Sequence, residues 1–186
     1  MKTEIPEYIK NRLNDGEQVI WSGKPENYEL NEGSAKKLLT KSLTVNGIIA
    51  AALIILYVVV CLAVGSAVSA GVIGIIVVVT GAIAAGPALD RNKLLKEAKY
   101  YVTDSRVIVA MSENNLWSLS RTGVKVRKAE GFDGNETILF GAAVDVPEKK
   151  IIKYSINPMT ESEGQVTGLI FFNLPKDCEV NRLFNI

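Results

Sequence analysis

A long stretch without charged residues divides the chain into three parts. No Asp, Glu, Lys or Arg occurs from Ser42 to Leu89, so every charge lies in one of the two flanks. The stretch consists of two apolar halves, residues 43–64 and 67–89, which meet at Gly65-Ser66. A helix rises about 1.5 Å per residue and the hydrocarbon of a bilayer is about 30 Å thick, so each half can cross once. The pattern predicts a two-helix transmembrane hairpin over residues 42–89.

Lipid is the expected surrounding of this hairpin. Residues 54–64 and 72–79 are apolar on every side, which is typical of helices buried in lipid or in a large protein core. The flanks are too small to supply such a core. A cleaved signal peptide would have an apolar core of about 7–15 residues near the N-terminus, whereas here a mostly polar segment, 1–41, comes first.

Basic residues flank the hairpin on both sides: Lys36, Lys37, Lys41, Arg91, Lys93 and Lys96. Basic residues within about 15–20 positions of a span remain cytoplasmic, so we expect a multi-pass protein of the cell membrane with both termini in the cytoplasm. The same cations could contact anionic lipid headgroups, each contributing about 1 kcal/mol. Setting the topology is by itself a sufficient explanation of their position, so both interpretations stay open.

Small residues recur at helical spacing in both halves: Gly47, Ala51, Gly74, Gly81 and Ala85. Small side chains let helix backbones approach closely in lipid, so we expect these residues to form a packing seam. Neither half contains an acidic or basic residue, and such residues are the usual mark of an ion or proton route. The hairpin is therefore expected to be an anchor.

The periodicity changes after Pro87. Short β-branched and aromatic runs separated by turn residues predict strands at 100–103, 106–111, 115–121, 124–128, 137–140, 150–156 and 165–173. Several short strands of this kind indicate an antiparallel barrel or sandwich. Pro175 and Asp177 then mark a helix start, and Val180, Leu183 and Phe184 fall on one helical face. We expect this last helix to close the open end of a barrel.

Three strings in this region resemble a known family. They are YYVTDSRVIV from Tyr100, TILFG from Thr137 and GLIFFNLPKDCEVNRLF from Gly168. Their order resembles bacterial pleckstrin-homology-like (PH-like) domains, in particular the membrane-anchored group with a two-helix hairpin ahead of the domain. The resemblance implies a seven-stranded, strongly bent barrel capped by the C-terminal helix, and a role in lipid-surface or protein binding. It implies no catalytic residues. The expected fold class is thus an α+β membrane protein: a transmembrane hairpin plus a small antiparallel PH-like β-barrel with a helical cap.

The N-terminal flank predicts a short helix and a strand. Ile5, Tyr8, Ile9 and Leu13 lie at helical spacing, and residues 17–21 alternate like a strand. An isolated strand is unstable, so this one could pair with an edge of the C-terminal sheet, which would make the hairpin an insertion into one domain. The expected divisions are 1–41, 42–89 and 90–186. In the turn at Thr103-Asp104, Arg106 either pairs with Asp104 or lies along the sheet.

The polar residues do not form a recognisable active site. Histidine is absent, the net charge is +1, and Cys61 and Cys178 lie too far apart in the expected fold to pair. We expect no metal, cofactor or enzymatic activity, and candidate acids fall in polar loops: Asp133, Glu136, Glu161 and Glu163. Nucleic-acid binding is not expected either, since Lys125 and Arg127 would lie on the solvent face of a strand.

The sequence therefore favours a noncatalytic, membrane-anchored PH-like binding module at the cytoplasmic surface, in contact with lipid headgroups or a protein partner. The alternative is a structural subunit of a membrane complex, including a homo-oligomer. A carboxylate-based enzyme is a distant third.

Overall fold

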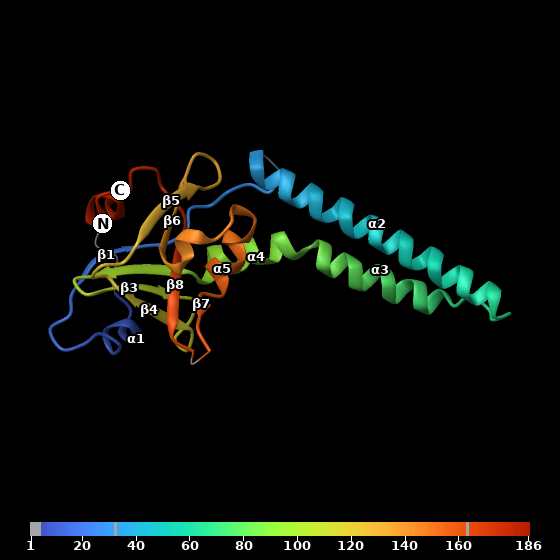
Figure 1. Ribbon diagram of the computed structural model, residues 1–186, viewed down its shortest axis with the longest axis horizontal. Helices are drawn as coiled ribbons and strands as arrows, with labels where there is room; N and C mark the ends of the chain where they lie inside the picture. The colour runs from blue at the N-terminus through green and yellow to red at the C-terminus, as the bar shows by residue number, and fades with distance from the viewer. Residues whose placement is uncertain (1–4, 32, 163) are drawn as a thin grey trace. The chain divides into compact units, whose positions relative to one another are not determined.

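The computed structural model describes residues 5–31, 33–162 and 164–186. The predicted acid Glu163 lies outside the described residues. The chain forms two compact units, one made of the segments up to Tyr28 and from Asp90 onward, the other of Glu29–Leu89. The first unit contains the strands found among the described residues, and the second is a pair of helices (Figure 1). The helical pair is thus an insertion: the chain leaves the strand-rich domain after Tyr28 and returns to it at Asp90.

The first sheet joins residues from both sides of the insertion. It has four antiparallel strands in the order β1-β2-β3-β4, with bounds Val19–Gly23, Lys99–Thr103, Arg106–Ala110 and Leu116–Ser120. Trp21 of β1 lies opposite Val102 of β2, and Tyr101 of β2 lies opposite Ile108 of β3. The strand predicted at 17–21 therefore pairs with the C-terminal sheet, and α1, Glu7–Lys10, precedes it.

The second sheet is also antiparallel. Its strands follow the order β5-β6-β8-β7, with bounds Val126–Glu130, Glu136–Gly141, Val166–Leu174 and Met159–Thr160. Together the two sheets contain the predicted strands at 100–103, 106–111, 115–121, 137–140 and 165–173, with ends that differ by at most one residue. The strand predicted at 124–128 is shifted by two positions.

The predicted closed barrel is wrong. The described strands form two separate sheets, and no ladder joins one to the other. Between β4 and β5 the chain turns at Gly123, whose φ of +69° breaks the extended backbone. At the far edge β7 has only two residues, too few to carry a ladder onward. The structure is therefore a mixed α+β domain with two four-stranded sheets.

An aromatic cluster packs the two sheets together. The Phe171 ring of β8 is stacked on Tyr100 of β2, with ring centroids 4.7 Å apart, and meets Phe140 of β6 edge to face at 4.8 Å. Trp21 of β1 is stacked on the same ring at 5.9 Å. The backbone N–H of Phe172 donates to the Tyr100 hydroxyl at 3.1 Å, so the buried phenol also has a polar partner in the opposite sheet.

The structure corrects the expectation for two segments of the domain. One predicted strand is a helix, and the C-terminal helix does not close a barrel. The strand predicted at 150–156 is helix α5, Ile151–Ile156, which follows the short helices η1, Ala142–Asp145, and η2, Glu148–Lys150. Ile151 and Ser155 are buried at a spacing of four, and the Ser155 hydroxyl donates to the Ile151 carbonyl at 2.9 Å. The C-terminal helix α6 is confirmed at Glu179–Phe184. It packs Phe184 against Phe140, at 5.0 Å, instead of closing a barrel.

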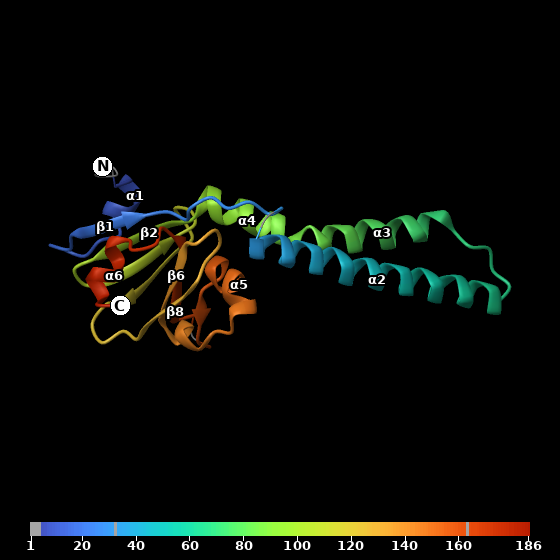
Figure 2. The same cartoon turned by 90° about the horizontal axis from the view of Figure 1, so that it is seen from above.

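The inserted unit contains one helix that is clearly long enough to cross a membrane (Figure 2). Helix α2 is Gly33–Ala63, and its segment Ala35–Ala63 meets the length and hydropathy expected of a span. Helix α3, Ala70–Ala84, has 15 residues and is about 22 Å long. It meets the same test only together with α4, Gly86–Glu97, from which it is bent by 43°.

A single continuous second span at 67–89 is therefore not present. Pro87 has no N–H to donate to a carbonyl one turn earlier, so the helix breaks at the Ala85–Gly86 junction. The connection between α2 and α3 is also longer than expected, because Gly65 has a φ of +65° and helix resumes only at Ala70.

Asn173 secures the segment through which the chain leaves the domain. This fully buried residue accepts a hydrogen bond from the Phe132 N–H at 2.7 Å and donates to the Glu26 carbonyl at 2.9 Å through its side chain. Its own carbonyl accepts the Glu26 N–H at 2.8 Å. Asn173 has a φ of 52°, a conformation that Asn tolerates better than most residues. The side chain therefore fastens residue 26 to the end of β8.

We predict that Asn173→Gly destabilises the domain. Glycine tolerates the positive φ, so the main loss is the two side-chain hydrogen bonds, which leaves the Phe132 N–H and the Glu26 carbonyl without these partners. The free energy of unfolding should fall by about 2–4 kcal/mol. Urea unfolding of the full chain in detergent, followed by tryptophan fluorescence, measures it, because Trp21 and Trp117 both lie in the first sheet.

The matched control is Asn185→Gly. Asn185 has a φ of 54° but is exposed, so the change in unfolding free energy should stay within about 0.5 kcal/mol. Equal effects of the two substitutions would contradict the role given to the Asn173 side chain.

Candidate functional site

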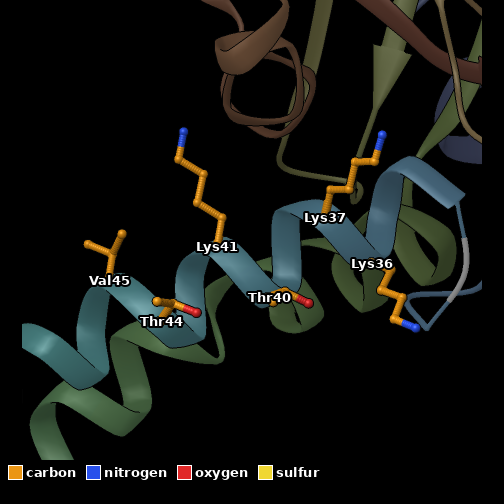
Figure 3. Close-up of a pocket in the computed structure, with 6 residues that line it drawn as sticks. All are labelled: Lys36, Lys37, Thr40, Lys41, Thr44 and Val45. Carbon is orange, nitrogen blue, oxygen red and sulfur yellow. The ribbon is translucent and has the colours of Figure 1, made fainter.

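The start of α2 carries an open groove with a basic rim, the α2 groove (Figure 3). It has a volume of about 480 Å³ and is lined by Lys36, Lys37, Thr40, Lys41, Thr44 and Val45. All three lysines are exposed. No Asp or Glu occurs between Gly33 and Leu89, so the helix itself provides no acidic partner for them. The α2 groove therefore combines positive charge with an apolar lining.

The lysines of the α2 groove do not all point the same way. Lys37, Lys41 and Val45 follow each other at intervals of four, and Figure 3 shows their side chains projecting from the same side of the helix. Thr40 and Thr44 form the adjacent row, while Lys36 points in another direction. Two of the three lysines of the α2 groove are thus brought together on one face of the helix.

Beyond the α2 groove the surface of α2 is apolar and exposed. Ile48, Ile55 and Leu62 expose 65%, 64% and 71% of their surface. The core helix of a water-soluble domain would bury such side chains, whereas a helix in lipid leaves them on its outside. The cations are therefore placed where an apolar helix surface begins.

The small residues lie away from the contact between α2 and α3. Gly47, Ala51, Gly74 and Gly81 are exposed and Ala85 is half-buried. A Cβ atom placed on any of the three glycines would meet no neighbouring atom within 4 Å, so these glycines do not bring the two helices together.

The less exposed faces of α2 and α3 are instead partly polar. The Ser42 hydroxyl donates to the Ala84 carbonyl across the pair at 3.1 Å, and the Tyr57 hydroxyl accepts the Ser69 N–H at 3.0 Å. Less exposed residues follow helical spacing along both faces: Ser42, Asn46, Ala50, Ile54 and Cys61 on α2, and Ile73, Ile76, Thr80 and Ala84 on α3. Their helical spacing is the signal from which the seam could have been predicted in the sequence, in place of the small residues.

Arg91 is committed to contacts within the domain. Its Nε donates to the Tyr28 carbonyl and its Nη2 to the Asn27 Oδ1, both at 2.7 Å, and its guanidinium lies 5.4 Å from the centre of the Tyr28 ring. Burial raises the pKa of Tyr28 to about 12. Arg91 thus joins the residues where the chain leaves and re-enters the domain. The other predicted cations of α4, Lys93 and Lys96, are exposed.

A partly buried ion pair holds the N-terminal segment on the first sheet. Arg106 contacts Glu17 through two hydrogen bonds, Nη2 to Oε2 at 2.6 Å and Nε to Oε1 at 3.0 Å, and the Glu17 side chain is only 3% exposed. The hydroxyls of Thr103 and Ser105 also donate to Glu17, at 2.6 and 2.9 Å. The Arg106 bond holds the pKa of the Glu17 carboxyl down at about 2.

Of the two alternatives given for Arg106, pairing with Asp104 is therefore wrong, because the guanidinium contacts Glu17. Asp104 instead accepts the Gln18 N–H at 3.4 Å. Glu17 could not be found in the sequence. It precedes β1, on the other side of the insertion from Arg106, and no local spacing connects the two residues. Since its carboxylate oxygens are occupied by groups of the same chain, this cluster is structural.

Two other polar candidates, Arg127 and Glu136, make contacts within the domain. Arg127, expected on the solvent face, donates to the carbonyls of Val144 and Val146 at 2.7 and 3.1 Å, whereas Lys125 is exposed. Glu136 accepts a hydrogen bond from Asn181 and lies 3.5 Å from the Lys128 ammonium. Among the described residues, no three His, Cys, Asp or Glu side chains are grouped so as to hold a metal ion.

We predict that Glu17→Gln destabilises the domain and weakens its acid sensitivity. The pKa of Glu17 is lower in the folded state than its ordinary value of 4.5, so the carboxylate stabilises the fold above pH 4.5. This stabilisation is lost as the pH falls toward 2. Glu17→Gln should lower the free energy of unfolding at pH 7 by about 2 kcal/mol. The difference from the unsubstituted chain should shrink below pH 4.5, as urea unfolding at several pH values will measure.

Glu113→Gln, an exposed position in the turn before β4, is the control and should have little effect at any pH. A loss at Glu17 that does not change with pH would show that the charge of the carboxylate is not what stabilises the fold.

Comparisons with protein-family models, curated proteins and solved structures found no match for this chain. The residues themselves therefore carry the functional argument, and the PH-like resemblance enters it as a proposal. Among the predicted site residues, the exposed lysines at the beginning of an apolar helix are the strongest candidates for contact with another molecule.

Proposed function

We propose that the chain is a noncatalytic binding module of the PH-like type, anchored in the cell membrane by a two-span hairpin and acting at the cytoplasmic membrane surface. The single observation that carries the proposal is the row of exposed lysines where the apolar surface of α2 begins. These cations contact anionic lipid headgroups. The lipid class, the membrane orientation and the PH-like relationship are all part of the proposal.

The pairing of β1 with β2 supports two crossings. One strand precedes the insertion and the other follows it, and they share a ladder in which Trp21 lies opposite Val102. A chain that crossed the membrane once would place them on opposite sides and break this sheet. A crossing by α2 therefore calls for a return. Helix α3, Ala85 and the first four residues of α4 together have 20 residues, which at 1.5 Å per residue follow about 30 Å of chain, the thickness of the hydrocarbon.

The flanking charges support a cytoplasmic position of the domain. Lysines stand close to both ends of the hairpin, whereas the connection around Gly65 carries no charge. Basic segments tend to remain in the cytoplasm. The exposed lysines available for lipid contact are Lys36, Lys37, Lys41, Lys93 and Lys96, while Arg91 is held by Tyr28 and Asn27.

The PH-like part of the proposal draws on the order of the elements. Antiparallel strands carrying the three quoted strings are followed directly by the C-terminal helix α6, as the resemblance implies. The division into two sheets departs from a closed barrel, so the proposal concerns the order of elements and the binding role.

A second candidate function, an assembly subunit, is favoured by the exposed glycines of the hairpin. Gly47, Gly74 and Gly81 present backbone to the outside of the helix pair, with no neighbouring atom within 4 Å of an added Cβ. In lipid such positions allow the close approach of another helix, from a second copy or a protein partner.

We predict that the connection at residue 66 and the strand-rich domain lie on opposite sides of the membrane. Single cysteines are introduced by Ser66→Cys or by Lys149→Cys in a chain that also carries Cys61→Ala and Cys178→Ser. In intact cells a membrane-impermeant maleimide should label residue 66 directly and residue 149 only after permeabilisation. Labelling of both without permeabilisation, or of residue 149 alone, would contradict the proposed topology.

We predict that the full chain in detergent retains phosphatidylglycerol in preference to phosphatidylcholine, and that added salt reduces the preference. Replacing the five exposed lysines named above by Gln should abolish it, because about 1 kcal/mol is expected from each cation. Mass spectrometry of the lipids that co-purify with the protein provides the measurement.

The control replaces five exposed lysines of the domain, Lys125, Lys149, Lys150, Lys153 and Lys176, and should leave the preference unchanged. Equal effects of the two sets would refute a local lipid contact. A protein that co-purifies in fixed proportion, without any lipid preference, would favour the assembly role.

A further inference from the structure

We propose that Lys37 and Lys41, together with Thr40 and Thr44, hold the phosphate of one anionic phospholipid molecule, whose acyl chain lies along the apolar surface that starts at Val45. This inference rests on the proposed function and refines it, because it replaces a diffuse basic rim by a site for a single lipid.

The positions of two lysines allow them to bind the same phosphate. Lys37 and Lys41 are one helical turn apart, and their side chains project from the same side of α2 (Figure 3). Both are exposed, and the helix contains no acidic residue that could neutralise them. Two ammonium groups on one face can contact the same phosphate, and hydrogen bonds between charged groups are the strong ones. Lys36 points elsewhere and is left outside the site.

Two threonine hydroxyls add further hydrogen-bond donors for the phosphate. Thr40 and Thr44 line the same groove, in the row next to the two lysines. A threonine hydroxyl has one hydrogen to donate, which suits the unesterified oxygens of a phosphodiester. Four hydrogen-bond donors in two adjacent rows of the helix suit one compact anion, such as a phosphate, better than a diffuse layer of headgroups.

The apolar lining identifies the source of the phosphate. The groove ends at Val45, and the next exposed residues on α2 include Ile48 and Ile49. A free phosphate would leave this apolar surface without a partner, whereas an acyl chain covers it. Lysine stems can lie along the chain while their ammonium groups reach the headgroup. The occupant is therefore a lipid of the leaflet.

The test compares two double variants with the same loss of charge. Lys37→Gln/Lys41→Gln removes the proposed phosphate ligands, and Lys36→Gln/Lys93→Gln removes two exposed cations outside the site. Both leave the same number of basic residues beside the hairpin, so a general effect of charge on topology is shared. The full chain is purified in detergent and titrated with phosphatidylglycerol, and native mass spectrometry counts the lipids bound to each protein molecule.

The expected result is one phosphatidylglycerol per chain, with an affinity reduced at least about tenfold more by the first double variant than by the second, whose lysines contribute only to the diffuse attraction of anionic headgroups. Thr40→Val/Thr44→Val keeps the size of the side chains and should reduce the affinity by about threefold. Glycerol 1-phosphate, which offers the phosphate without acyl chains, should not displace the lipid at equal concentration.

The outcomes separate this site from the proposed function. Equal losses in both double variants would overturn the site and leave a diffuse lipid contact standing. Complete displacement by glycerol 1-phosphate would overturn the choice of a lipid as occupant. Absence of any preference for anionic lipid in the unsubstituted chain would overturn both the site and the proposed lipid-binding function.

Discussion

The ladder between β1 and β2 is the constraint on which the rest of the structure depends. It joins a strand that precedes the apolar insertion to one that follows it, so both must be in the same aqueous compartment. A lone transmembrane helix cannot satisfy this condition. Once α2 is taken to cross the membrane, α3 and the start of α4 have to return, however short and bent they are. Pairing in the sheet thereby supports the proposed second crossing, which hydropathy alone leaves open.

Contacts within the domain reinforce the junction with the insertion. The segment that leads out of the domain is held at Glu26 by Asn173 and at Tyr28 by Arg91, while Arg91 itself stands at the point of return. The Tyr28 ring is also stacked on Phe132, with centroids 4.3 Å apart. Exit and return are thus fastened to the same part of the core. Arg91 illustrates how a cation that looks like part of a basic flank can be used internally.

Periodicity along the chain was sufficient for most of the strands, because their alternating apolar residues reflect burial between two sheets. It failed at residues 150–156, where a run of β-branched residues is compatible with either a strand or a helix, and the helical burial of Ile151 and Ser155 decides in favour of α5. The pattern of residues allowed either a barrel or a sandwich, and the C-terminal helix and the resemblance both favoured the barrel. That the two-residue edge strand β7 and the turn at Gly123 leave the two sheets separate could be predicted from neither.

The candidate site was only partly accessible to sequence analysis. Counting charges located the lysines, but their directions depend on helical phase, which places Lys37 with Lys41 and separates Lys36. The small residues were assigned to the helix seam because small size is a common signal, whereas the actual seam follows Ser42 and Asn46. Glu17 could not be found, since its partner Arg106 lies 89 positions away in the chain.

The insertion also has a consequence for biosynthesis. A ribosome releases β1 well before β2. Trp21 cannot pair until Val102 has been synthesised, 81 residues later. Closing a loop of that length costs conformational entropy and slows folding. If α2 and α3 pair during membrane insertion, the two ends of the loop meet before the sheet forms. The hairpin would then act as a template that shortens the search for the first ladder, and the domain could complete its fold only after the anchor is in place.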